Sequence, residues 1–547
     1  MPIGNNKTYD TQPKVFPLFP SVSRSVDRLG FDIYDYEFLF QDKKTVELIR
    51  EGNTIGCFYI ESPGMRSLLR RLDVDNYELL VAASSVIRPG VAESGMMDEF
   101  ILRHHHPERR TYLLPELKKY LGETYGVMIY QEDVLKVAHH IVGLTLDEAD
   151  FLRRAMSGKM RSHKAMEMIR ERFFTSCKKK NYSDFVANEL WRQIESFAGY
   201  AFCKAHSASF ALLSYQVAFL KAHYPAEFLA SVLSNRGGYY AAAVYVQEAK
   251  RLGIEVKLPS INESEYEYTG TQKIIRIGFL AIKNFSRESA NKIVEERNRA
   301  GSYSSLFNFF MRTRIGYEEM KSLIRCGAMD CFAKNRPGLL RELDVHLQKY
   351  KFENESFFAD ELEQYLGESL ICPVDYSIEE KCAIEYETFG FMVTKHPLEF
   401  IPELSNHKAV IKAAEMKNYN GKQVRMIGWF MTSKRIKTKK GEIMKFLSLE
   451  DLSGTFEAVI FPKTYTQYAE KTFSMGPYFL LGKVEMKNGN TIIVEKLEVL
   501  TNAKVKALLQ KDSTENKYYG DEDSVTAEDV LTLTTLDHEK LKRAYLG

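Results

Sequence analysis

The sequence of 547 residues lacks several patterns that would assign it to a common class at once. None of its seven cysteines forms a CxxC pair, which excludes a zinc ribbon or a thioredoxin-like centre. No run of about 18 apolar residues is present, so we expect no membrane-spanning helix and no membrane partner. Neither sign of charge dominates, because 75 Lys and Arg stand against 73 Asp and Glu. A nucleic-acid partner would therefore have to bind a local basic patch.

The first residues carry no apolar segment of the kind found in secretory signals. The odd number of irregularly spaced cysteines favours thiols in a reducing compartment over a disulfide framework. Both observations predict a cytoplasmic protein. Residues 1–24 are polar and rich in Pro, Ser and Asn, and we expect a poorly ordered lead-in.

Recognisable catalytic motifs are also absent, since no Walker A loop and no GxSxG elbow occurs. Carboxylate pairs at DxD spacing occur at Asp73 and Asp75 and at Asp521 and Asp523, but neither pair follows a hydrophobic strand that would hold it rigid. The run His104–His106 precedes Pro107 and charged residues and is typical of a surface loop. We therefore assign no catalytic residue and no metal ligand from the sequence.

What is present is typical of a folded protein of several domains. Hydrophobic residues make up 45% of the chain and charged residues 27%. Apolar residues three or four apart predict helices through most of the chain up to about residue 234. The stretch Ser207–Leu220 is apolar nearly all round and predicts a buried helix that ends before Pro225. Thr145, followed by Asp147 and Glu148, has the pattern of a helix start.

The pattern changes to short strands in residues 421–500. Five runs with strand character alternate with turns there, which predicts a small antiparallel barrel. A shorter pair of strand-like runs, Ile254–Leu258 and Lys273–Phe279, could pair with each other. The predicted fold class is thus multidomain, mainly α-helical and followed by a small all-β barrel.

Two clusters in the helical part could bind phosphate. Arg153, Arg154 and Lys159 end a predicted helix and could converge on a polyphosphate, although cations also favour solvated helix ends. Lys204, His206 and Ser207 open the apolar helix, where exposed N–H groups bind anions. The alternative for this second cluster is a serine N-cap beside a satisfied histidine.

A third cluster, of basic residues, lies between the first two predicted strands of the barrel. We interpret it as a loop that holds single-stranded nucleic acid, with Trp429, Phe430 and Phe446 as aromatics that could stack on bases. The alternative is an ordinary solvated loop. The basic residues are Lys434, Arg435, Lys437, Lys439 and Lys440.

Six ordered blocks give the chain a resemblance to a known family. The chain resembles the alpha subunit of bacterial DNA polymerase III, a family C replicative polymerase. The blocks are TIGCFYIESPGMR at 54–66, AASSVIRPG at 82–90, GVMIYQEDV at 126–134, LRRAMSGK at 152–159, WRQIESFAGY at 191–200 and KAHSASFALLSY at 204–215.

The resemblance implies a layout and a set of binding roles. It implies a fingers domain at 25–270, a helix-hairpin-helix region that binds DNA at 271–337, a connector with a small mixed segment at 338–416, an OB-fold at 421–500 and a C-terminal tail at 501–547. Arg153, Arg154 and Lys159 become candidate contacts of the incoming dNTP, with Lys204, His206 and Ser207 as supporters. Primer–template DNA, single-stranded template, a sliding clamp and other replisome subunits become expected partners.

Several features depart from the family pattern. The palm domain, whose aspartates hold two Mg²⁺ ions in the family, has no counterpart in this sequence, so we expect no autonomous polymerisation and a separate palm-bearing chain as a possible partner. The usual Gly-hydrophobic-Gly hairpin is replaced by Asn284-Phe-Ser286. A clamp-binding peptide could correspond to Glu355–Phe358, although an ordinary connector fits that stretch better. The alternatives to a polymerase portion are a non-catalytic DNA-binding accessory protein and a degenerate copy.

Overall fold

The computed structural model describes residues 32–88, 95–156, 163–195, 203–332, 334–352, 374–438 and 440–501. These residues form two compact units. One unit joins Ile33–His223 with Ala409–Val499, and the other consists mainly of Tyr224–Lys408. Each unit is described by itself below.

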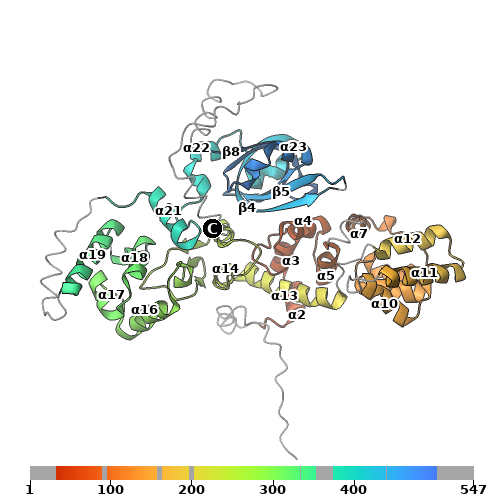
Figure 1. Ribbon diagram of the computed structural model, residues 1–547, viewed down its shortest axis with the longest axis horizontal. Coiled ribbons are helices and arrows are strands. Elements are labelled where there is room, and N and C mark those ends of the chain that lie inside the picture. The colour runs from red at the N-terminus through yellow and green to blue at the C-terminus, as the bar shows by residue number, and fades with distance from the viewer. Residues whose placement is uncertain are drawn as a thin grey trace, which may run out of the picture. The chain divides into compact units, whose positions relative to one another are not determined.

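The first segment of the larger unit, Ile33–His223, is helical (Figure 1). The helices that the sequence predicts here are confirmed. The described helices are α2 (Tyr36–Gln41), α3 (Lys43–Arg50), α4 (Pro63–Leu72), α5 (Tyr77–Val86), α7 (Met96–His105), α8 (Leu117–Leu121), α9 (Gln131–Lys136), the π-helix η3 (Val137–Val142), α10 (Leu146–Met156), α11 (His163–Lys179), α12 (Asp184–Glu195) and α13 (Lys204–His223).

Short polar side chains start several of these helices. The predicted cap of α10 is confirmed, because the Glu148 N–H donates to Thr145 Oγ1 (3.2 Å) and the Thr145 N–H donates to Glu148 Oε2 (3.0 Å). This reciprocal pair satisfies two backbone donors that the helix itself leaves open. Asn76 caps α5 in a similar way by accepting from the Leu79 N–H (2.8 Å).

Helix α13 is the buried centre of this segment and packs on α5 and α3. Its buried Lys221 donates from Nζ to the carbonyl oxygens of Asn53 (2.7 Å) and Ile55 (2.8 Å), which offsets the cost of burying the charge. The predicted buried helix is therefore confirmed. It ends at His223, and Pro225 occupies the first turn of the next helix, where its missing N–H costs nothing.

The second unit begins with that next helix and contains a small sheet. Strand β1 pairs in parallel with β3, and β3 pairs antiparallel with β2, so the pairing predicted for the two strand-like runs is confirmed. Part of the predicted connector is helical, since α19 runs through it. The main elements are α14 (Pro225–Ser234), α15 (Ala242–Arg251), β1 (Glu255–Lys257), β2 (Thr269–Thr271), β3 (Ile274–Arg276), α16 (Arg287–Ala300), α17 (Leu306–Thr313), α18 (Tyr317–Arg325), α19 (Arg336–Phe352), α21 (Ile378–Phe389) and α22 (Pro402–Ser405).

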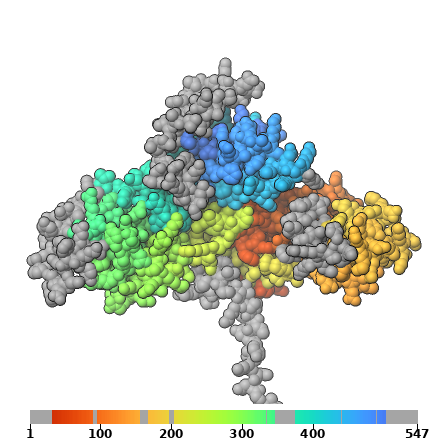
Figure 2. All heavy atoms as spheres, viewed as in Figure 1, coloured from red at the N-terminus to blue at the C-terminus, as the bar shows by residue number. Residues whose placement is uncertain are grey.

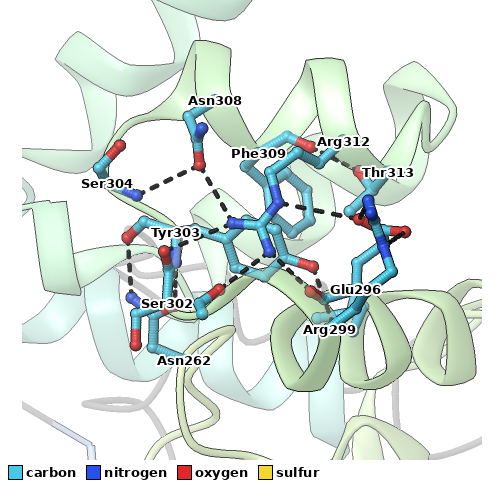
Figure 3. A network of polar contacts seen from close by, with 12 residues as sticks. Asn262, Glu296, Arg299, Ser302, Tyr303, Ser304, Asn308, Phe309, Arg312 and Thr313 are labelled. Atoms are coloured by element: carbon cyan, nitrogen blue, oxygen red, sulfur yellow. Dashed lines mark hydrogen bonds and ion pairs between the residues drawn. The ribbon is translucent and has the colours of Figure 1, made fainter.

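One arginine fixes the turn between α16 and α17 (Figure 3). The Arg312 guanidinium donates to the carbonyl oxygens of Glu296 (2.7 Å) and Gly301 (2.9 Å), and it stacks over the Tyr303 ring at 4.3 Å. Asn262 holds the other side of Tyr303, accepting from its N–H (2.7 Å) and donating to its carbonyl oxygen (3.1 Å). The planar guanidinium satisfies carbonyl groups that end α16, so the two helices are held in one register.

The predicted barrel is confirmed as a closed sheet of five strands in the order β4-β5-β6-β8-β7 (Figure 1). Helix α23 (Pro462–Tyr468) lies between β6 and β7, which together with the strand order is the arrangement of an OB-like barrel. The strands are β4 (Gln423–Lys437), β5 (Ile443–Glu450), β6 (Thr455–Ile460), β7 (Tyr478–Glu485) and β8 (Thr491–Val499).

Alternating inward side chains fill the barrel. Leu447, Leu449, Leu480 and Leu497 are fully buried, and the barrel forms one closely packed block in blue when all atoms are drawn (Figure 2). A β-bulge after Leu481 brings Gly482 so close to the next strand that a Cβ there would lie 2.1 Å from the Ile493 carbonyl oxygen. Only glycine fits at this contact.

One local prediction for the barrel is wrong. The basic stretch expected to be a loop lies mostly in β4, where Lys434, Arg435 and Lys437 pair with Phe446, Lys445 and Ile443 of β5. Backbone hydrogen bonds form the ribbon without requiring apolar side chains, so a charged sequence can be a strand. Just beyond β4, the Thr438 N–H donates to the Glu442 carbonyl oxygen (2.8 Å).

Within the described ranges, every helix is too short or too polar to cross a lipid bilayer.

Candidate nucleotide- and DNA-binding surfaces

Arg153 and Arg154 lie side by side near the end of α10 and share one carboxylate. Arg153 donates to Asp150 Oδ1 from Nε (3.0 Å) and Nη2 (2.8 Å), and Arg154 Nε lies 3.0 Å from Asp150 Oδ2. The Arg153 hydrogen bonds hold the pKa of Asp150 below its usual value. The third predicted member, Lys159, falls outside the described residues.

Lys204 begins α13 and is held by two glutamates. Its ammonium donates to Glu123 Oε2 (2.7 Å) and its backbone N–H donates to Glu132 Oε2 (2.9 Å). The same ammonium lies 5.4 Å from the centre of the Tyr130 ring. The side chain is 44% exposed, so an anion from solvent can reach it.

The two predicted phosphate clusters meet at the start of α9. Arg153 Nη1 donates to Gln131 Oε1 (3.1 Å), while the Lys204 N–H binds Glu132, the next residue. Arg153 through its side chain and Lys204 through its backbone N–H therefore contact consecutive residues of one helix, although 47 residues separate α10 from α13. The α10 and α13 clusters therefore lie at the same helix start.

A buried carboxylate, that of Asp133, fixes the start of α9. Asp133 Oδ2 accepts hydrogen bonds from the N–H groups of Ile129 (3.0 Å) and Tyr130 (3.0 Å). Burial raises the pKa of Asp133 to about 6, against the lowering effect of these two bonds. Burial also raises the pKa of Tyr130, whose hydroxyl therefore stays protonated at neutral pH.

His206 and Ser207 differ in how they could act. His206 packs on Phe210 with ring centres 4.1 Å apart. Ser207 is fully buried in the first turns of α13, and its hydroxyl lies 2.8 Å from that of Ser85 in α5. Ser207 therefore joins two helices and is not the N-cap that one interpretation of the sequence suggested.

Residues without an assigned role in the sequence complete this surface. The Arg88 guanidinium hydrogen-bonds the Tyr59 hydroxyl and lies 5.4 Å from the centre of that ring. Tyr59 in turn packs edge-on against Phe210 (5.0 Å). Arg88, Tyr59 and Phe210 belong to three different blocks of the family resemblance, and that shared membership was the one signal in the sequence that could have grouped them.

Among the described residues, no group of three or more His, Cys, Asp and Glu side chains is arranged to hold a metal ion. Asp73 lies 3.8 Å from Arg50 in an exposed ion pair, and His105 hydrogen-bonds the Arg71 carbonyl oxygen (2.7 Å). Asp521 and Asp523 fall outside the described residues.

One exposed ribbon of the barrel, β4–β5, carries the predicted basic cluster. Lys434, Arg435, Lys437 and Lys440 are all exposed, while Lys439 lies outside the part that the structure describes. Of the three candidate stacking residues, Phe446 lies directly across from Lys434, and all three aromatics are half-buried. The ribbon can thus offer several cations to a nucleic-acid backbone.

Lys445, opposite Arg435, is buried. Its ammonium donates to the Thr472 carbonyl oxygen (2.6 Å) and to Thr472 Oγ1 (3.1 Å). Burial lowers the pKa of Lys445 to about 8. This lysine fastens the ribbon to the segment after α23 and does not present its charge to solvent.

The hairpin before α16 has its anion-binding position already filled. The Ser286 N–H donates to Glu319 Oε1 (2.8 Å), and the Ser289 hydroxyl donates to Glu319 Oε2 (2.6 Å). Asn284 takes the left-handed conformation (φ 58°) that a glycine usually supplies. The backbone turn is therefore kept without glycine, while its donors bind an internal carboxylate. The candidate clamp peptide Glu355–Phe358 is outside the described residues.

Comparison with protein families gives matches to the helical segment and to the region around the hairpin before α16. Residues 24–181 match the finger domain of the bacterial DNA polymerase III alpha subunit, and residues 253–339 match a helix-hairpin-helix motif. The chain therefore carries parts typical of a DNA polymerase.

Comparison with individual proteins gives the particular relative. The chain is 33% identical over 481 residues to the DNA polymerase III subunit alpha of Staphylococcus aureus, covering 86% of this chain and 44% of that protein. It is 34% identical over 459 residues to the same subunit of Staphylococcus epidermidis, covering 82% of this chain and 42% of that protein. The chain is thus related to the DNA polymerase III alpha subunit and spans less than half the length of these relatives.

Proposed function

We propose that this chain takes part in DNA-templated DNA synthesis as a portion of a DNA polymerase III alpha subunit. In this proposal the helical segment Ile33–His223 contacts the incoming dNTP. The helix-hairpin-helix region and the barrel hold primer–template DNA and single-stranded template.

The observation that carries the proposal is the meeting of Arg153 and Lys204 at the start of α9. Without a ligand, two carboxylates balance these cations and Arg154: Asp150 binds the two arginines, and Glu123 binds the Lys204 ammonium. A triphosphate would compete for the same cations through charge-assisted hydrogen bonds. His206 and Ser207 support the surface from α13, Ser207 from beneath.

Catalytic Mg²⁺ enters the proposal as a requirement of the reaction. Phosphoryl transfer depends on positioning and on metal ions that stabilise the developing charge. We assign no residue of this chain to Mg²⁺. The proposal therefore places its ligands in a palm supplied by other residues, and the 547 residues alone should not extend a primer.

Equilibrium binding of a labelled dNTP to the full chain tests the nucleotide role. We expect Arg153→Ala and Lys204→Ala each to weaken binding by about tenfold or more, because each removes a charge-assisted hydrogen bond. Arg172→Ala is the matched control, since Arg172 pairs with Glu148 at the other end of α10. Equal affinity of both variants and the unchanged chain would contradict the role of this surface.

A second candidate function is favoured by the exposed cations of β4. The chain could act as an accessory protein that binds DNA without catalysis. This alternative predicts salt-sensitive DNA binding but no effect of dNTP at the α9–α10 surface. Loss of dNTP binding in the Arg153 variant would argue against it.

A further inference from the structure

A cavity of about 600 Å³ lies within the second unit, next to the hairpin before α16. It is lined by the end of α14, the segment Arg236–Ala242, Tyr266 and Tyr268, the turn before α16, and two phenylalanines after and within α21. Its volume is typical of sites for small molecules.

The walls of the cavity are aromatic. Tyr240, Tyr245 and Tyr268 are each less than 10% exposed, as are Phe389 and Phe391. The Tyr240 N–H donates to the Tyr245 hydroxyl (3.0 Å), which fixes the two rings against each other. Such rings offer stacking surfaces to a planar ligand.

The charge of the lining has one sign. Arg236 and Lys283 line the cavity, and no Asp or Glu does so. Arg236 donates to the Leu280 carbonyl oxygen (2.7 Å), and neither cation has a carboxylate partner among the described residues. Arg287 adds a third cation beside the cavity, 4.8 Å from the centre of the Tyr266 ring. The combination suits a ligand that is both aromatic and anionic.

One hydroxyl in the cavity wall makes no hydrogen bond to the described residues. Tyr268 is 4% exposed, and within the described residues its hydroxyl makes no hydrogen bond. Burial raises the pKa of Tyr268, so the hydroxyl is a donor at neutral pH. Because Tyr268 lines the cavity, this hydroxyl can donate a hydrogen bond to a ligand there.

We propose that this cavity binds a single nucleotide, with its base against the tyrosines and its phosphate at Arg236 and Lys283. The turn Lys283–Phe285 that lines the cavity leads into α16, within the residues that match the helix-hairpin-helix motif. Glu319 already accepts from the Ser286 N–H and the Ser289 hydroxyl at the start of α16, so in this proposal the phosphate binds the side chains of Arg236 and Lys283, which line the cavity. The nucleotide could be free or part of a DNA strand.

Photo-crosslinking identifies the occupant's position directly. The full chain is irradiated with a single-stranded oligonucleotide that contains 5-iododeoxyuridine, a base that crosslinks to tyrosine, and the adducts are mapped by mass spectrometry. We expect an adduct on Tyr240, Tyr266 or Tyr268. Adducts found only on other residues, such as the barrel aromatics, would overturn the proposal while leaving DNA binding by the chain intact.

Equilibrium titrations separate the two sources of nucleotide. The probes are dTMP, a short oligonucleotide and the same oligonucleotide with abasic positions. If the ligand is a free nucleotide, Arg236→Ala should weaken binding of dTMP about tenfold or more. If the nucleotide belongs to a DNA strand, the same change should lower the crosslink yield of the oligonucleotide and leave dTMP binding unchanged. Tyr268→Phe keeps the ring and removes the hydroxyl. It should reduce whichever of these two quantities Arg236→Ala reduces, dTMP affinity or crosslink yield, by several-fold.

Lys273→Ala is the matched control, because Lys273 is exposed at the β2–β3 turn and does not line the cavity. Circular dichroism and a melting curve establish that each variant is folded, and Arg236→Lys provides a milder second variant. The proposal is overturned if neither Arg236 variant nor Tyr268→Phe changes dTMP binding or crosslinking, or if the abasic oligonucleotide protects the tyrosines as well as the intact one does.

Discussion

At the scale of single residues, two partly exposed carboxylates hold the cations of the α9–α10 surface. Asp150 holds Arg153 and Arg154 at the end of α10, and Glu123 holds the ammonium of Lys204. These pairs keep long side chains ordered in the absence of ligand. Less side-chain entropy is then lost when an anion binds.

The carboxyl group of Asp133 predicts a dependence of stability on pH. Its pKa is raised from 3.8 to about 6 in the folded chain. Between these two values the folded state binds more protons than the unfolded state, so this group lowers the stability of the fold as pH rises from about 4 to about 6. Above pH 6 its effect is constant.

Asp133→Asn keeps an oxygen that can accept the two backbone hydrogen bonds but does not ionise. Thermal unfolding from pH 4 to pH 7 should show the variant gaining stability over the unchanged chain up to about pH 6, by about 1–3 kcal/mol in total, followed by a constant difference. A difference that is already constant from pH 4 upward would mean that Asp133 ionises normally.

The sequence predicts which residues form the two phosphate clusters. It does not predict that the two clusters lie at the same helix start. The hydrogen bonds from Lys204 cross 72 and 81 residues of sequence to reach Glu132 and Glu123. No periodicity within a helix indicates such a contact. The role of Ser207 was equally hidden, because its partner Ser85 is 122 residues away.

At the scale of elements, strands and helices with a clear apolar period were predicted well. The five barrel strands follow the alternation of the sequence, and the cap at Thr145 follows from its own side chain. The extension of β4 was missed because Lys434, Arg435 and Lys437 interrupt the apolar alternation. Its pairing with β5 depends on the backbone, which is the same for charged and apolar residues.

The β4–β5 ribbon gives a prediction for DNA binding. Changing Lys434, Arg435, Lys437 and Lys440 together to Ala should weaken binding of single-stranded DNA. It should also reduce the slope of log K against log salt by up to about 3, because each lost phosphate contact removes about 0.7. Fluorescence anisotropy at several salt concentrations measures both quantities.

The control for this experiment changes four exposed lysines that lie outside the barrel, Lys43, Lys44, Lys178 and Lys179, to Ala. The net charge changes by the same amount in both variants. If the two variants lose the same affinity and the same salt slope, the ribbon has no special role in DNA binding.

At the scale of the whole molecule, the chain combines a helical segment and a helix-hairpin-helix region with a closed barrel. The helical and barrel classes follow from sequence periodicity. The helix-hairpin-helix region follows from the family resemblance, which rests on six blocks within residues 54–215. The cavity beside the hairpin was not predictable, because its tyrosines, cations and phenylalanines come from segments between residues 232 and 391. Only the folded unit brings them together.

Primer extension tests the proposed function of the whole chain most directly. The purified chain, a separately expressed palm-bearing segment of a related alpha subunit, and their mixture are each given primer–template, Mg²⁺ and the four dNTPs. We predict that neither protein alone extends the primer as the mixture does, and that Arg153→Ala in this chain reduces extension by the mixture. Failure of the mixture, with both proteins folded and the DNA bound, would contradict the account, as would extension by this chain alone.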